Sequence, residues 1–185
     1  MTQNSAALPS GTSRVLTLTA MGLGFAVVQL DVTIVNVALE RIGSSFGGGV
    51  AGLQWVVNAY TVVFASLILT SGALGDRLGA KRLFIAGFGL FVVASMACGA
   101  APSLVMLIGA RAIQGIGASV LVPCSLTLLN HTYQERRSRA NAVGIWAGVA
   151  SVALACGPVI GGGLIAGIGW RPIFFINLPL GVLGI

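Results

Sequence analysis

The stretch Gly72-Ala73-Leu74-Gly75-Asp76-Arg77-Leu78-Gly79-Ala80-Lys81-Arg82 separates two long apolar runs, near residues 52–74 and 83–101. Its glycines permit a tight turn, its acid lies near a helix end, and its basic cluster is typical of the cytoplasmic face of a membrane. A plain basic loop would explain the basic residues but not the order Gly-Asp-Arg-x-Gly. The stretch therefore indicates two membrane-spanning helices joined by a short loop of specific sequence.

The composition of the whole chain also indicates a membrane protein. Its 185 residues are 56% hydrophobic and 8% charged, with a mean hydropathy of +0.99. A soluble domain has roughly 25% charged residues, because polar groups must cover much of its surface. The net charge of +6 does not indicate nucleic-acid binding, since the charges fall between apolar runs. Lipid is the expected surrounding.

The residue types that hold metals or carry out catalysis are scarce. Cys98, Cys124 and Cys156 all lie inside apolar runs, which predicts free buried thiols rather than a disulfide framework. His131 is the only histidine, and it lies in a polar loop. We therefore expect no metal site, no cofactor and no enzymatic activity.

Apolar stretches of about 20 residues, long enough to cross a hydrocarbon core of about 30 Å, recur along the chain. They predict spans near residues 15–38, 52–74, 83–101, 104–128 and 140–168, and a sixth over 173–185 that is incomplete. Residues 1–14 are predicted to form a polar cytoplasmic tail. The fold class that follows is an all-α integral membrane protein with a six-helix bundle over 15–185. Its sixth helix is truncated, because the chain is either a fragment or a naturally short product.

The basic residues of the loops predict the orientation, because Lys and Arg are retained on the cytoplasmic side. Most of them fall on one side of the predicted spans: Arg14, Arg77, Lys81, Arg82, Arg136, Arg137 and Arg139. Arg41 and Arg171 fall on the other side. We therefore expect a multi-pass protein of the plasma membrane with its N-terminus in the cytoplasm.

Two charged residues are predicted to lie within the membrane, Asp31 in the first span and Arg111 in the fourth. Either costs about 2.5–3.5 kcal/mol near the centre of a spanning helix, so each needs a partner or a wet cavity. Both lie about seven residues from the outer ends of their spans, or roughly 10 Å deep, so they are able to pair. Three interpretations remain open: a static ion pair, a pair that protonation of Asp31 breaks, and a carboxylate for which a cationic substrate competes.

Other polar, aromatic and small residues within the spans are further candidates. Six could line a cavity, although an inter-helix hydrogen bond worth about 0.6 kcal/mol is the simpler interpretation of each: Gln29, Asn36, Asn58, Tyr60, Gln114 and Trp146. Pro158 removes a backbone donor and is expected to kink the fifth helix. The glycines of that helix would allow close packing: Gly144, Gly157, Gly161 and Gly162.

Five strings, in this order along nearly the whole chain, resemble motifs of the major facilitator superfamily. The 72–82 stretch is similar to its loop between helices two and three. Residues 30–39 look like the first-helix motif of the fourteen-helix drug:proton antiporter branch, and 111–118 like the fourth-helix motif. Residues 157–162, with Gly144 upstream, resemble the fifth-helix antiporter motif, and 170–179 resemble the entry to helix six. The sequence departs from these patterns at four positions: Glu40, Ala80, Ala153 and Pro172.

The resemblance implies the N-terminal half of a transporter that exports hydrophobic or cationic drugs in exchange for protons. It implies coupling roles for Asp31 and Arg111, a bend at Gly157 and Pro158, and a cytoplasmic gate made of Gly72, Asp76, Arg77, Gly79, Lys81 and Arg82. Such transporters place the substrate between two bundles, so a missing C-terminal half or a second copy would be needed. Two alternatives remain: a non-transporting membrane protein that associates with a full-length relative, and an uncoupled metabolite facilitator.

Overall fold

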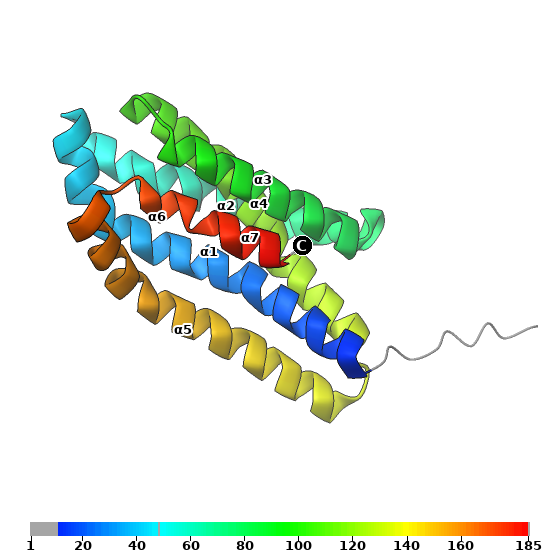
Figure 1. Ribbon diagram of the computed structural model, residues 1–185. Coiled ribbons are helices and arrows are strands. Elements are labelled where there is room, and N and C mark those ends of the chain that lie inside the picture. The colour runs from blue at the N-terminus through cyan, green and yellow to red at the C-terminus, as the bar shows by residue number, and fades with distance from the viewer. Residues whose placement is uncertain (1–10, 48, 185) are drawn as a thin grey trace, which may run out of the picture.

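The computed structural model describes residues 11–47 and 49–184, and the described residues form helices joined by short connections (Figure 1). The helices are α1 (Gly11–Phe46), α2 (Val50–Leu78), α3 (Ala80–Gly99), α4 (Leu104–Thr132), α5 (Arg136–Ile168), α6 (Pro172–Phe175) and α7 (Asn177–Gly184). No described residue lies in a β-strand. Within the described ranges, the five helices α1 to α5 are long and apolar enough to cross a membrane.

The helices extend beyond the apolar runs from which the spans were predicted. Residues 1–10 of the predicted tail lie outside the described residues, whereas residues 11–14 belong to the first turn of α1. At its other end, α1 continues past Ala38 to Phe46. Ser44 and Ser45 donate hydrogen bonds to the Arg41 carbonyl there, and Trp170 donates to the Ser45 hydroxyl at 3.0 Å. Hydropathy thus marks the apolar part of this helix rather than its ends.

The predicted loop at residues 72–82 is almost entirely helical. Leu78 ends α2, Ala80 begins α3, and only Gly79 lies between the two helices. Gly79 has φ +96°, a backbone conformation that side-chain-bearing residues rarely adopt, and its N–H donates to the Gly75 carbonyl. The turn between two spans is therefore made by one residue. The charged residues on either side of it are held on helix ends.

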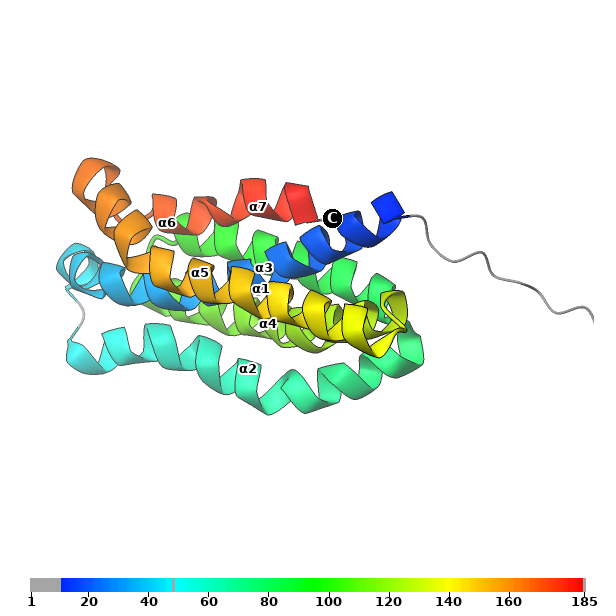
Figure 2. The same ribbon diagram turned by 90° about the horizontal axis from the view of Figure 1, so that it is seen from below.

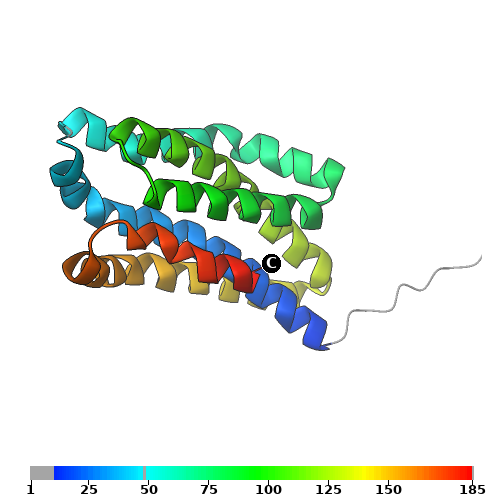
Figure 3. The same ribbon diagram turned by 45° about the horizontal axis from the view of Figure 1, so that its top comes forward.

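The long helices pack in two groups, α1 with α5 and α4 with both α2 and α3, and contact between α1 and α4 joins the groups. The short helices α6 and α7 lie over α1 and α3, on the opposite side of the bundle from α2 (Figures 2 and 3). The predicted sixth span is thus two short helices, with Ile176 between them.

Close contact between α2 and α4 depends on one glycine. A Cβ atom on Gly115 would lie 2.6 Å from the Tyr60 carbonyl oxygen, which is closer than side-chain carbons approach backbone atoms. Small residues permit such approaches where lipid provides no hydrophobic drive for helix association. The contact sets the spacing of α2 and α4 one turn from Arg111. The polar site between these helices therefore depends on tight packing.

Two apolar clusters fill the bundle, and the buried charges lie between them. One cluster includes Phe88 and Phe91, and the other includes Ile34 and Phe174. Along α1 and α4, Asp31 and Arg111 fall where one cluster gives way to the other. Both charged groups are therefore enclosed by packed side chains on either side.

Candidate functional site

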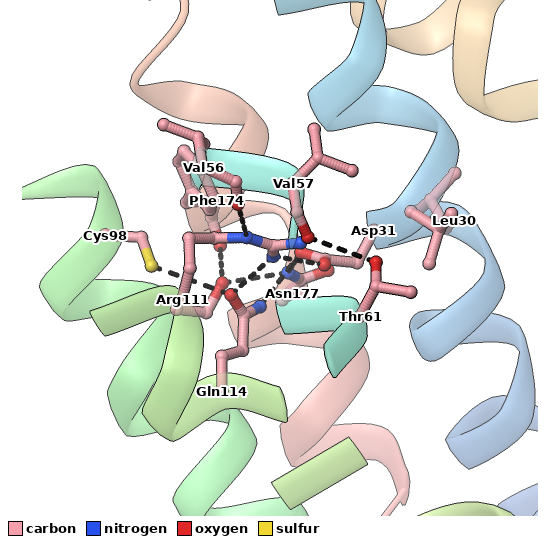
Figure 4. A network of polar contacts seen from close by, with 12 residues as sticks. Leu30, Asp31, Val56, Val57, Thr61, Cys98, Arg111, Gln114, Phe174 and Asn177 are labelled. Carbon is pink, nitrogen blue, oxygen red and sulfur yellow. Dashed lines mark hydrogen bonds and ion pairs between the residues drawn. The ribbon is translucent and has the colours of Figure 1, made fainter. Parts of the chain in front are cut away.

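An ion pair between Asp31 and Arg111 forms the centre of the candidate site. Asp31 of α1 and Arg111 of α4 are 0% and 1% exposed, and Arg111 Nη1 lies 2.5 Å from Asp31 Oδ2 (Figure 4). It is the only ion pair found within residues 11–47 and 49–184. The sequence indicated that two charges at similar depth could pair, and the geometry shows that they do. Breaking such a buried pair leaves a charge without compensation.

Arg111 also has partners that do not depend on Asp31. Its Nε donates to the Val56 carbonyl at 3.2 Å, and its Nη1 donates to Gln114 Oε1 at 2.8 Å. Its guanidinium lies over the Tyr60 ring, 4.2 Å from the ring centroid. A cation over an aromatic face is attracted by the electron-rich ring. Arg111 would therefore keep several contacts if the charge on Asp31 were neutralised.

The second oxygen of the Asp31 carboxylate is held by two amides. Oδ1 accepts hydrogen bonds from Gln114 Nε2 at 2.9 Å and from Asn177 Nδ2 at 3.2 Å. Asn177 Nδ2 also donates to Ser95 Oγ at 2.8 Å, and Ser95 donates to the Phe174 carbonyl at 2.8 Å. We call this set the Asp31 cluster: Asp31, Tyr60, Ser95, Arg111, Gln114 and Asn177. It joins α1, α2, α3, α4 and α7 through polar contacts.

The arrangement limits what the carboxylate can do. With no exposed surface and hydrogen-bond donors on both oxygens, Asp31 is closed to direct contact with a substrate in this conformation. A proton is small enough to reach such a group, and it would remove the negative charge that holds Arg111. Donors within a low-dielectric interior act strongly on a charge, so a change of one proton changes many contacts together.

The candidate cavity-lining residues divide into two groups. Tyr60 and Gln114 belong to the Asp31 cluster. Trp146 is buried elsewhere, where it donates to Ser125 Oγ at 3.1 Å and stacks on Phe25 with ring centroids 4.2 Å apart. Gln29 is half-buried, while Asn36 and Asn58 are exposed. Asn36 donates to the Val32 carbonyl of its own helix, so the structure does not bring these three to the cluster.

The charged residues of the 72–82 segment lie at the surface of the bundle. Asp76, Arg77, Lys81 and Arg82 are all exposed, and none forms an ion pair with another described residue. Gly72 lies against Pro123 of α4, where an added Cβ would still fit at an ordinary 3.5 Å. The segment is therefore ordered by its helices rather than by contacts of its charges.

The fifth-helix glycines differ in what they contact. Added Cβ atoms on Gly157 and Gly161 would overlap Thr33 and press on Ile34 of α1, so both glycines permit the packing of α5 on α1. Gly144 and Gly162 have no such neighbour within 4 Å. Helix α5 stays continuous through the exposed Pro158 and curves toward its C-terminal end (Figure 2).

Three members of the site were not among the predicted site residues: Ser95, Cys98 and Asn177. Cys98 donates its thiol to Gln114 Oε1 at 3.6 Å. The only sequence feature that could have identified these three residues as part of the site is a polar or thiol side chain inside an apolar run, which is a weak signal. Asn177 gave the clearest signal, because an amide inside a spanning segment is costly without a partner.

Comparisons with known proteins agree with this fold. The family model described as Major Facilitator Superfamily matches residues 21–185. The methylenomycin A resistance protein of Bacillus subtilis is 44% identical over 181 residues, which are 97% of this chain and 39% of that protein. The multidrug resistance protein Stp of Mycobacterium tuberculosis is 44% identical over 171 residues, covering 92% of this chain and 32% of Stp. This chain therefore spans well under half the length of these relatives.

Solved structures share the arrangement of helices. A bacterial homologue of the human lysosomal transporter Spinster, in an inward-facing and occupied conformation, superposes with a TM-score of 0.84 at 21% sequence identity. The match covers 95% of this chain and 44% of that one. At this level of identity the likeness establishes the fold alone.

Proposed function

Because the chain belongs to the major facilitator superfamily, we propose that it forms the N-terminal, proton-coupling half of an efflux antiporter for hydrophobic or cationic compounds. The observation that carries the proposal is the fully buried Asp31–Arg111 pair. An intramembrane carboxylate is costly, and an uncoupled carrier has no need of one. Names of relatives support the efflux direction, since they include multidrug resistance and drug efflux proteins.

In the proposed cycle, Asp31 takes up a proton when the site is open to the outside and loses it when the site is open to the cytoplasm. Protonation weakens the contact with Arg111, which retains the Val56 carbonyl, Gln114 and the Tyr60 ring. The protonated and unprotonated forms of the cluster then stabilise different conformations of the bundle, so proton uptake shifts the population from one to the other. Because Asp31 is buried and does not contact substrate directly, proton uptake would affect substrate export only by changing which conformation the bundle prefers.

A second bundle is part of the proposal. Helices α2 and α5 are the least buried of the long helices. In their apolar stretches 22% and 17% of the residues are buried inside the bundle, against 56% in α1 and α4. Transporters of this type bind substrate between two bundles that rock against each other. The exposed faces of α2 and α5 would meet that second bundle, supplied by further chain or by a second copy.

The remaining assignments follow from this arrangement. The protein would lie in the plasma membrane, with its N-terminus and the 72–82 segment on the cytoplasmic side. There Asp76, Arg77, Gly79, Lys81 and Arg82, with Gly72, would form a gate that stabilises one conformation. The Gly157–Pro158 bend would let α5 adjust at the face between the bundles.

Transport by this chain in liposomes with an imposed pH gradient tests the proposal. Efflux of a fluorescent lipophilic cation is expected from liposomes that contain the unaltered chain, and a protonophore is expected to abolish it. The variant Asp31→Asn removes the titrating group with little change of shape, so it should also lose gradient-driven efflux.

The matched control is Glu40→Gln, which makes the same carboxylate-to-amide change on the same helix at an exposed position. It should transport like the unaltered chain. Efflux that survives both Asp31→Asn and the protonophore would overturn proton coupling. If the correctly inserted chain moves no cation, two copies of it do not form a transporter, and the second bundle must come from further chain or from a full-length relative.

A further inference from the structure

Asn177 lies at the start of α7, fully buried and beside Asp31 of α1 (Figure 4). Its amide also donates to Ser95 of α3. We propose that Asn177 is a positioning residue of the Asp31 proton site, whose amide turns over when the carboxylate takes up a proton and so passes the change to the α6–α7 junction. This inference rests on the proposed proton coupling. It names Asn177 as the residue through which a change in the protonation of Asp31 would reach α6 and α7, which the ion pair alone does not explain.

The first observation is an unused acceptor. Asn177 Oδ1 is buried and has no hydrogen-bond partner in the part of the chain that the structure describes, although Nδ2 of the same amide has two. A buried polar atom without a partner loses its hydration and gains no hydrogen bond in exchange. Oδ1 is therefore available to accept a hydrogen bond if a donor is presented to the amide, and Nδ2 then takes the position that has no partner.

The second observation separates Asn177 from the other amide at the carboxylate. Gln114 Nε2 also donates to Asp31 Oδ1, but Gln114 Oε1 already accepts from Arg111 Nη1 and Cys98 Sγ. Turning Gln114 would give up both contacts. Asn177 can turn without losing an acceptor contact, and the two hydrogen bonds that its Nδ2 donates are replaced by two that its Oδ1 accepts from the same residues.

Protonation of Asp31 supplies the missing donor. Oδ2 faces the guanidinium cation of Arg111, so Oδ1 is the oxygen where a proton is better placed. The proton comes from water on the open side, one O–H bond forms, and no electron is transferred. The new O–H then points at the N–H donors of Asn177, an arrangement of donor against donor. Rotation of the amide by half a turn brings Asn177 Oδ1 to accept from Asp31.

The turn also reverses the contact with Ser95. The unprotonated cluster has Asn177 Nδ2 donating to Ser95 Oγ, while Ser95 donates to the Phe174 carbonyl. After the turn, Asn177 Oδ1 faces Ser95, so the hydroxyl proton moves from the Phe174 carbonyl to Asn177. Phe174 lies in α6, two residues before the break at Ile176. The junction between α6 and α7 thus loses a contact that ties it to α3.

The other titratable groups around Asp31 come from three helices. Arg111 faces it from α4, Tyr60 from α2 and Cys98 from α3. Among the described residues, α5, α6 and α7 bring no charged side chain to it. Asp31 is therefore the one carboxylate of this group, and its proton is the one the Asn177 amide meets.

Solid-state NMR of the unaltered chain in lipid bilayers tests the turn directly. The chain has only two aspartates, Asp31 and Asp76, so carboxyl-¹³C aspartate gives two signals. Side-chain ¹⁵N asparagine adds the amide nitrogen of Asn177. We expect a dipolar coupling between the Asp31 carboxyl carbon and the Asn177 nitrogen above the Asp31 titration midpoint. Below it, the coupling should be lost as the amide oxygen replaces the nitrogen.

Two variants assign the signals and a third serves as the control. Asp76→Asn identifies the Asp31 carboxyl signal, and Asn177→Leu should remove the coupling. Asn141→Leu changes an exposed asparagine of α5 and should leave both the coupling and the titration unchanged. The pH series on the unaltered chain decides the question even if Asn177→Leu fails to insert.

The outcomes separate the two proposals. If the Asp31 signal shifts with pH while the coupling persists at every pH, the role of Asn177 is wrong and proton uptake at Asp31 stands. If the Asp31 signal does not shift at any pH at which the chain stays inserted, proton coupling is wrong and this inference fails with it.

Discussion

The charged side chains of the Asp31 cluster and those of the 72–82 segment differ in burial and in partners. In the cluster, Asp31 and Arg111 are fully buried, and their partners come from four helices, α1, α2, α4 and α7. In the segment, Asp76, Arg77, Lys81 and Arg82 are exposed and form no ion pair with the other described residues. The cluster is complete within one bundle, whereas the segment presents its charges outward.

The comparison shows that a distinctive sequence motif, such as the 72–82 segment, need not form a network of contacts like that of the Asp31 cluster. Exposed charges contribute little to stability, with a median near 0–1 kcal/mol for a surface pair, while an unpaired buried charge is strongly destabilising. Substitutions in the cluster should therefore change stability and transport together. Substitutions in the segment should affect only processes that involve a partner or a second conformation.

The largest effect is expected from Arg111→Leu. It leaves the Asp31 carboxylate buried without its cation, so we expect the free energy of unfolding in detergent micelles to fall by about 3–5 kcal/mol. Chemical denaturation followed by circular dichroism measures the change. The double variant Asp31→Leu with Arg111→Leu removes both charges and should recover a large part of the loss. Equal losses for the single and double variants would contradict the ion pair as the source.

A smaller effect is expected from Gly115→Ala. The added methyl would press on the Tyr60 carbonyl and separate α2 from α4, at a cost of about 1–3 kcal/mol by the same denaturation assay. Gly109→Ala is the matched control, because it changes an exposed glycine of α4 with no neighbour within 4 Å. The control should leave stability unchanged or raise it by up to about 1 kcal/mol. If the two variants behave alike, the close approach at Gly115 does not matter.

The sequence predicted the apolar spans and two buried charges at a similar depth that could pair, because hydropathy and depth along a helix depend on residue order alone. It could not predict the full membership of the cluster. Whether Asn177 or Asn58 faces Asp31 depends on how each helix is rotated about its axis, which packing decides. Hydropathy also missed that α1 continues to Phe46, since polar residues such as Ser44 and Ser45 can extend a helix beyond the apolar core.

The smallest effect on stability is expected from Arg77→Ala. This exposed side chain has no ion-pair partner among the described residues, so the free energy of unfolding should change by no more than about 0.5 kcal/mol. If the segment is a gate, the same variant should still slow cation efflux in the liposome assay. A loss of stability comparable to that of Arg111→Leu would show that the two regions do not differ as described.

Proton movement coupled to cation efflux tests the central claim, that the buried Asp31–Arg111 pair carries proton coupling. Liposomes that contain the chain and a trapped pH-sensitive dye report protons that cross the membrane as a lipophilic cation crosses in the opposite direction. The account predicts this proton flux for the unaltered chain and for Glu40→Gln, and its loss in correctly inserted Asp31→Asn. Undiminished cation-driven proton flux in Asp31→Asn would contradict the account.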